Sequence, residues 1–92
     1  MHPGPVLVYF AAAWCQPCQT IAPLVQELEK KNPQIAFFKV DADAQPGIAT
    51  QFSVRSLPTF ISLVDGRRVD CFTGSSAAAL GAMVMNLGGV CK

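Results

Sequence analysis

The sequence has no block of like charges and no long apolar run. Seven lysines and arginines balance six aspartates and glutamates among its 92 residues, and they are spread along the chain. This even balance lacks the basic patch of a nucleic-acid-binding protein and the polybasic segment of a membrane-surface protein. The longest apolar run, Val6 to Cys15, is about half of the roughly 20 residues that span a bilayer. We therefore expect neither nucleic acid nor a membrane among the partners.

Signals for export and for division into several units are also missing. No positively charged segment precedes the apolar run, so we read it as a buried strand and not as a signal peptide. A chain of this length, without repeats or a linker, predicts one domain over residues 1–92. Four cysteines without a visible export signal favour a reducing, cytoplasmic location, where a lone CxxC pair is more often catalytic or metal-binding than structural.

The apolar periodicity predicts the order βαβαββα, an α/β fold. Alternating strands and helices imply a parallel βαβ unit with a right-handed crossover, and the later hairpin adds antiparallel strands to the same sheet. The last helix is expected to be capped by Ser75 or Ser76 and to end at Gly88-Gly89. The expected strands are residues 6–11, 35–40, 59–64 and 67–73, and the expected helices are residues 18–32, 46–52 and one from the serines to Leu87.

Cys15 and Cys18 follow the first strand and open the first helix, where open α/β sheets place their chemistry. A helix N-terminus offers unpaired N–H groups and partial positive charge that favour a thiolate. Cys15 is thus the candidate nucleophile, and Cys18, one turn further on, can resolve a mixed disulfide. Pro17 lacks only an N–H that the first turn does not need, and it fixes the backbone there.

Two other readings of the cysteine pair remain. A zinc site needs two more ligands, and the candidates Cys71, Cys91 and His2 do not have a ligand spacing. A structural disulfide closing so small a loop removes little entropy from the unfolded chain. A redox centre is favoured over both, and no bound metal is expected.

The segment Trp14-Cys15-Gln16-Pro17-Cys18 resembles the WCxPC active site of thioredoxins. The resemblance extends in register from about Val6 to Leu87 and implies a thioredoxin-like fold, a four-stranded mixed sheet flanked by three helices. It rests also on the segments Ile21-Ala22-Pro23, Lys39-Val40-Asp41-Ala42-Asp43, Gln45-Pro46-Gly47, Ser56-Leu57-Pro58-Thr59 and Phe72-Thr73-Gly74.

The resemblance also implies a function and a site. The function is a thiol–disulfide oxidoreductase that reduces protein disulfides, binds no cofactor and receives electrons from NADPH through a thioredoxin reductase. Pro58 would be a cis-proline beside Cys15, although an ordinary loop proline is the alternative, and Trp14 could instead belong to the core. A glutathione-linked, glutaredoxin-like enzyme and a non-catalytic binding module of the same fold remain alternative functions. The implied substrate groove comprises Trp14, Leu57, Pro58, Thr59 and Gly74.

Two positions depart from the family pattern near the cysteines. Tyr9 stands where thioredoxins usually carry a buried aspartate. The inward-facing lysine that accompanies this aspartate in the family is kept as Lys39. We expect Lys39 to extend to solvent, to find Asp41 or to lower its pKa, and we expect disulfide exchange to persist with an altered pH dependence. Gln16 replaces a glycine, and its amide could bind a thiolate or a substrate backbone, or could simply be solvated.

The remaining departure is length. Family members begin with an extra strand and helix, and this chain starts near the loop that follows them. The segment from Ile35 to Val40 is therefore expected to form a sheet edge, with an edge-strand homodimer as one consequence. Cys71 and Cys91 are expected to be unpaired thiols, with mutual or intermolecular pairing as the alternative, and His2 a solvated terminal residue.

Overall fold

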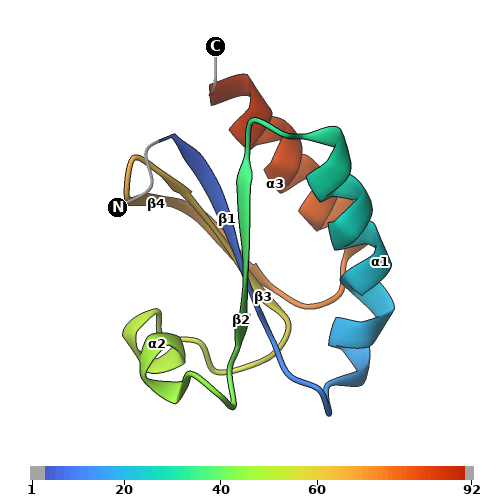
Figure 1. Ribbon diagram of the computed structural model, residues 1–92, viewed down its shortest axis with the longest axis vertical. Coiled ribbons are helices and arrows are strands. Elements are labelled where there is room, and N and C mark those ends of the chain that lie inside the picture. Colours follow the sequence, from blue (N-terminus) through green and yellow to red (C-terminus); the bar gives the residue numbers. More distant parts are fainter. Residues whose placement is uncertain (1–3, 91–92) are drawn as a thin grey trace.

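The computed structural model describes residues 4–90, with side chains described through Leu87. The predicted order βαβαββα is confirmed, as is the four-stranded mixed sheet with three helices (Figure 1). The elements are β1 (Pro5–Ala11), α1 (Gln16–Lys31), β2 (Ala36–Asp41), α2 (Pro46–Gln51), β3 (Thr59–Val64), β4 (Arg67–Thr73) and α3 (Ala77–Val90).

The strands lie in the order β2-β1-β3-β4, so β1 is central. It runs parallel to β2 and antiparallel to β3, and β3 pairs antiparallel with β4. The carboxyl ends of β1 and β2 therefore meet the start of β3 at one edge of the sheet. Cys15 lies just beyond the end of β1, so the cysteine pair is placed at that edge.

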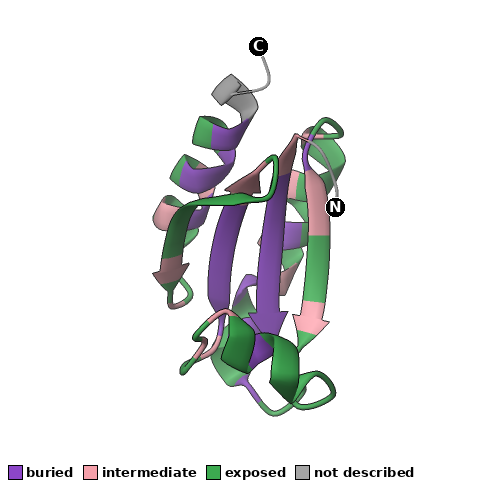
Figure 2. Cartoon of the chain, turned by 90° about the vertical axis from the view of Figure 1, so that its left-hand side faces the viewer, coloured by how far each residue is buried: buried purple, intermediate pink, exposed green. Residues whose placement is uncertain are grey.

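Alternate residues of β1 point to opposite faces of the sheet, and both faces are buried. Leu7, Tyr9 and Ala11 pack with α1 and α3 on one face, whereas Val6, Val8 and Phe10 pack with α2 on the other. Figure 1 shows α1 and α3 on the same side of the sheet and α2 on the opposite side. Burial is greatest in β1 and β3, while β2 and α2 are more exposed (Figure 2). The near-continuous apolar run of β1 reflects this double coverage.

Several element boundaries differ from the prediction by one to three residues. Helix α1 begins at Gln16, because Cys15 acts as its N-cap, and β2 begins at Ala36, one residue after Ile35. Helix α3 continues through Gly88-Gly89 to Val90, so the predicted end was wrong. Glycine disfavours a helix interior by only about 1 kcal/mol, which does not by itself end a helix.

The start of α3 settles which serine caps it. The Ala79 N–H donates to Ser76 Oγ at 3.1 Å, so the cap is Ser76 and not Ser75.

None of the helices in residues 4–90 combines the length and apolarity that crossing a membrane requires.

Candidate active site

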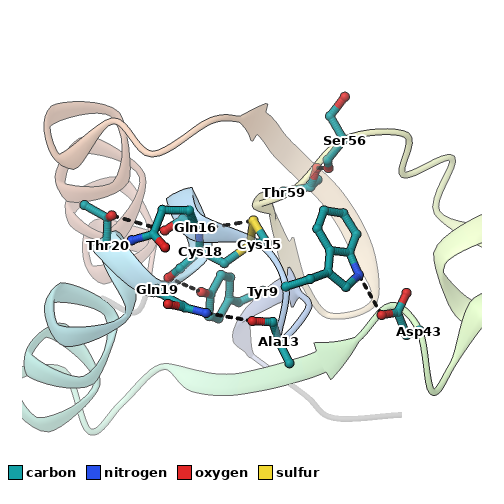
Figure 3. Close-up of a disulfide and its surroundings, with 11 residues drawn as sticks. Tyr9, Ala13, Cys15, Gln16, Cys18, Gln19, Thr20, Asp43, Ser56 and Thr59 are labelled. Carbon is teal, nitrogen blue, oxygen red and sulfur yellow. Dashed lines mark hydrogen bonds between the residues drawn. A yellow bond between two sulfur atoms is a disulfide. The ribbon is translucent and has the colours of Figure 1, made fainter.

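Cys15 and Cys18 form a disulfide, with their Cα atoms 5.3 Å apart (Figure 3). Cys15 is the N-cap of α1, and its Sγ accepts a hydrogen bond from the Cys18 N–H at 3.2 Å. The turn before the helix is closed by the Cys15 N–H, which donates to the Ala12 carbonyl oxygen at 3.1 Å. Both cysteines are largely buried, Cys15 at 3% and Cys18 at 2% exposure. The pair therefore occupies the positive end of a helix, with one backbone donor already aimed at the Cys15 sulfur.

The residues between and after the cysteines hold this turn. Pro17 lies in the first turn of α1, as expected from its missing N–H. The Gln19 side-chain amide donates to the Ala13 carbonyl oxygen at 2.6 Å, and the Thr20 hydroxyl donates to the Gln16 carbonyl oxygen at 3.1 Å. Gln16 is exposed, and its side-chain amide forms no hydrogen bond to any residue between 4 and 90. The sequence prediction had not included Gln19, whose amide ties the helix back to the turn.

Trp14 lies at the rim of the site and not in the core, with 69% of its surface exposed. Its indole N–H donates to Asp43 Oδ2 at 2.7 Å. Asp43 belongs to the turn after β2, where Asp41 Oδ1 accepts the N–H groups of Asp43 and Ala44 at 2.9 and 3.2 Å. The sequence prediction missed this role of Asp43. The available signal was that β2 pairs with β1, so the residues after both strands meet at one edge.

The loop before β3 reaches the same edge. The Leu57–Pro58 peptide bond is cis, and the Pro58 carbonyl oxygen accepts the Gly74 N–H at 2.9 Å. Thr59 pairs with Phe10 at the end of β1, which sets this loop beside the turn that carries Cys15. Leu57 packs against the buried cluster that includes both cysteines. The structure thus brings these residues and Trp14 to one end of the sheet.

Thr59 differs from the other predicted groove residues, because its side-chain hydroxyl is already hydrogen-bonded within the protein. Its hydroxyl donates to the Ser56 carbonyl oxygen at 2.6 Å and lies 3.0 Å from the Thr73 hydroxyl. Pro58 is also fully buried. The contribution of Thr59 is therefore to hold the loop against β4, and only the backbone of this segment is suited to contact a bound chain.

Tyr9 lies beneath the cysteine pair. Its hydroxyl donates to the Cys18 carbonyl oxygen at 3.0 Å, and its ring stacks on Phe60 with centroids 4.9 Å apart. Phe60 stacks in turn on Phe72 at 4.9 Å, which extends the column from β1 to β4. Burial raises the pKa of the Tyr9 hydroxyl above its ordinary value. Tyr9 is therefore a neutral hydrogen-bond donor at neutral pH and cannot act there as the base that a carboxylate would provide.

Lys39 borders a cavity of about 180 Å³ that also touches Cys18, Tyr9 and Asp41. Its side chain is exposed and forms no ion pair or hydrogen bond to another residue in the range 4–90. Asp41 uses its carboxylate on the turn after β2, so the expected pairing of Lys39 with Asp41 was wrong. Exposure to solvent, the first of the three expectations, describes this lysine.

The other metal and cysteine candidates stay apart from this site. Between residues 4 and 90 there is no group of three or more His, Cys, Asp or Glu side chains that could hold a metal ion. Cys71 is exposed on β4 and forms no disulfide with any described residue. Cys91 and His2 lie outside the described residues, so the expectations for them remain predictions.

The fold and the disulfide at the strand-to-helix turn define a dithiol–disulfide domain of the α/β class. The sequence profile of the thioredoxin family matches residues 2–86, and the chain belongs to that family. It is 41% identical over 70 residues to a thioredoxin H-type from Fagopyrum esculentum, a match that covers 76% of this chain and 60% of the relative. It is 42% identical over 79 residues to thioredoxin-2 from Pyricularia oryzae, covering 86% of this chain and 46% of the relative. This chain thus spans about half to three fifths of those relatives.

A solved structure supports the same family. The thioredoxin of Fasciola hepatica superposes with a TM-score of 0.88 at 38% sequence identity, and the match covers 90% of this chain and 80% of that one. The predicted resemblance to thioredoxins is therefore confirmed.

Proposed function

We propose that this protein is a thiol–disulfide oxidoreductase that reduces protein disulfides through Cys15 and Cys18. The observation that carries the proposal is the disulfide formed by a cysteine at the N-cap of α1 and a second one turn further on. Membership of the thioredoxin family supports it.

The reaction needs two thiol–disulfide exchanges. In the reduced protein, the Cys15 thiolate attacks one sulfur of a substrate disulfide, forms a mixed disulfide and releases the other substrate sulfur as a thiolate that takes up a proton. Cys18 then loses its proton, and its thiolate attacks Cys15 Sγ. This second exchange releases the remaining substrate sulfur and forms the Cys15–Cys18 disulfide, so two electrons pass to the substrate.

The surroundings of Cys15 support its role as the attacking residue. It lies at the positive end of α1, and the Cys18 N–H that contacts its sulfur can stabilise a thiolate there. Cys18 lies inside the first turn of α1, one turn beyond Cys15. We assign Cys15 to attack and Cys18 to resolution.

We assign substrate binding to the rim formed by Trp14, Leu57, Pro58 and Gly74. The exposed indole offers an apolar surface, and the loop before β3 offers backbone groups at the same end of the sheet. An extended substrate segment could pair with that backbone while its disulfide meets Cys15. Thr59 supports the loop from behind. Gln16, Pro17, Tyr9 and Lys39 are assigned to tuning the geometry and proton affinity of the cysteines.

The supply of electrons is part of the same proposal. We propose that the protein binds no cofactor and is recycled by an NADPH-dependent thioredoxin reductase in the cytoplasm. Relatives named thioredoxin come from plants, a fungus and a cyanobacterium, and one is named chloroplastic, so cell fractionation is the test of location. An edge-strand homodimer through Ile35 to Val40, also expected from the sequence, belongs to this proposal.

The test of function is reduction of insulin disulfides with either thioredoxin reductase and NADPH or glutathione as the donor. Wild type is expected to turn over with the reductase, whereas Cys15→Ser abolishes turnover. Cys18→Ser is expected to accumulate a mixed disulfide that can be trapped and identified by mass spectrometry. Turnover with glutathione alone would indicate a glutaredoxin-like enzyme, and turnover with neither donor would indicate a binding module. Activity that persists in Cys15→Ser would refute the mechanism.

A further inference from the structure

The resolving cysteine has a proton to lose and no base beside it. In the proposed exchange, on which this inference rests, Cys18 must release its proton before its thiolate attacks Cys15 Sγ. Cys18 is 2% exposed, so bulk solvent has little direct access to it. The Tyr9 hydroxyl already donates its proton to the Cys18 carbonyl oxygen and is neutral at neutral pH (Figure 3). The Cys15 sulfur is bonded to the substrate at this stage, so the proton acceptor must come from elsewhere.

A cavity of about 180 Å³ connects Cys18 with the protein surface. Buried residues, among them Tyr9 and Cys18, form its inner part. Exposed residues form its mouth, among them Gln19, Lys39 and Asp41. A small molecule that enters from solvent can therefore reach the wall that Cys18 forms.

Small side chains keep this cavity open. Ala11, Ala12 and Ala13 border it from the end of β1, and Ala22 borders it from α1. A protein cavity of about 150 Å³ is large enough to hold benzene. The volume beside Cys18 is therefore sufficient for a five-membered aromatic ring, and a larger side chain at Ala22 would occupy part of it.

The charges at the cavity favour a base that is neutral before it accepts the proton. The residues of β1 and α1 that border the cavity carry no charge at neutral pH, so its charged groups are Lys39 and Asp41 of β2. Asp41 Oδ1 accepts two backbone N–H groups of the following turn, which holds this carboxylate at the mouth. One positive and one negative charge give an anion no net attraction. Once a neutral base has become a cation, Asp41 stabilises it and Lys39 opposes it.

We propose that this cavity binds a small neutral nitrogen base of the imidazole class, which accepts the proton of Cys18 during resolution. The Cys18 S–H bond breaks, and the base becomes a cation. The Cys18 thiolate then forms a bond to Cys15 Sγ, and the bond from Cys15 to the substrate sulfur breaks. That sulfur leaves as a thiolate and takes up a proton from solvent. Imidazole suits this role because its pKa is close to neutral pH, where an acceptor is both available and strong enough.

Dithionitrobenzoate, a disulfide that releases a coloured thiolate at each exchange, times the resolving step separately. In a background with Cys71→Ser and Cys91→Ser, attack by Cys15 gives a first release that depends on reagent concentration, and resolution by Cys18 gives a second that does not. At fixed pH and ionic strength, imidazole is expected to accelerate the second release severalfold, less than the roughly 10²-fold of a positioned internal base. Absence of any second release would contradict the proposed function itself. A second release that imidazole leaves unchanged would overturn the cavity proposal alone.

Filling the cavity tests where the base acts. Ala22→Leu should remove most of the response of the second release to imidazole. The first release should keep its wild-type rate, which also shows that the variant is folded. Ala82→Leu, the same substitution at an exposed position of α3 that does not border the cavity, is the matched control and should keep the full response. A full response in Ala22→Leu would place the base outside this cavity and overturn the proposal.

The two charges test which class of base the cavity takes. Because imidazole becomes a cation, Lys39→Gln should raise its effect on the second release about twofold, and Asp41→Asn should lower it about twofold. Both side chains are exposed, so larger effects are not expected. The opposite order would indicate an anionic base. Loss in Asp41→Asn of the second release measured without imidazole would make Asp41 the acceptor. Either of these two results would overturn the proposal.

Discussion

The hydroxyl of Tyr9 donates a hydrogen bond to the carbonyl oxygen of Cys18 at 3.0 Å. This contact ties the first turn of α1 to the central strand, directly behind the disulfide. Because the Tyr9 ring also stacks on Phe60 in the core, packing fixes the position of the donating hydroxyl. Tyr9 thus stands at the position where thioredoxins usually carry a buried aspartate. Its hydrogen bond holds Cys18 in place, but its hydroxyl supplies no base.

Removing the hydrogen bond from Tyr9 to Cys18 should destabilise the protein. Tyr9→Phe keeps the ring stack and deletes only the hydroxyl, so we expect the free energy of unfolding to fall by about 1 kcal/mol. Urea denaturation followed by circular dichroism measures this loss. Thr20→Val, which removes an exposed side-chain hydrogen bond within α1, is the control. It is expected to lower the free energy of unfolding by less than Tyr9→Phe does. An unchanged midpoint in Tyr9→Phe would mean that the contact contributes nothing.

Tyr9 also predicts how stability changes at alkaline pH. Its folded-state pKa is raised by burial above the unfolded value of 10.0, so the folded state holds the proton more tightly. This contribution is fully present below pH 10 and is lost as pH rises through the folded pKa, with a slope of at most about 1.4 kcal/mol per pH unit. Tyr9 is the chain's one tyrosine, so tyrosinate absorbance reports its titration directly. Tyr9→Phe should lack this contribution to the loss of stability at alkaline pH. A tyrosinate signal that titrates with an ordinary pKa would contradict the raised pKa of Tyr9.

The fold was predictable because local signals agreed along the chain. The continuous apolar run of β1 indicated a strand covered on both faces, and Asp65-Gly66 indicated the hairpin between β3 and β4. The end of α3 was mispredicted because glycine was taken as a stop, although a helix can continue through it at modest cost. Sequence alone could not show whether such a glycine adopts the left-handed conformation that ends a helix.

The parts of the site formed by residues close together in sequence were predictable. The parts that depend on contacts between distant residues were less so. Cys15 and Cys18 are fixed by their spacing and by the helix that starts between them. The bond from Trp14 to Asp43 joins residues 29 positions apart, and nothing local signals it. Likewise, Lys39 and Asp41 share a strand and invite pairing, yet the Asp41 carboxylate is used by the following turn.

Asp43 should fix the orientation of Trp14 and thereby the rim of the groove. We expect Asp43→Ala to release the indole and to slow insulin reduction several-fold with only a small loss of stability, because the bond is exposed. Trp14 is the chain's one tryptophan, so its fluorescence anisotropy, expected to fall, measures the release. Asp70→Ala on β4 is the matched control and should leave both signals unchanged. Wild-type anisotropy in Asp43→Ala would show that the indole is held by other contacts.

Two glycines should respond in opposite directions to the same substitution. Gly74 has φ of +122°, where an L side chain is strained, and its N–H donates to the Pro58 carbonyl oxygen beside the active site. Gly74→Ala is therefore expected to cost about 1–3 kcal/mol and to reduce turnover by shifting the loop that carries Pro58. Gly47 lies in α2 with ordinary φ and with open space where a methyl group would lie, so Gly47→Ala should stabilise by about 0.5–1 kcal/mol and leave turnover unchanged. Thermal unfolding and insulin reduction on both variants provide the comparison. Equal effects of the two substitutions would mean that the backbone at Gly74 adapts without strain, and that its bond to Pro58 does not set the geometry of the site.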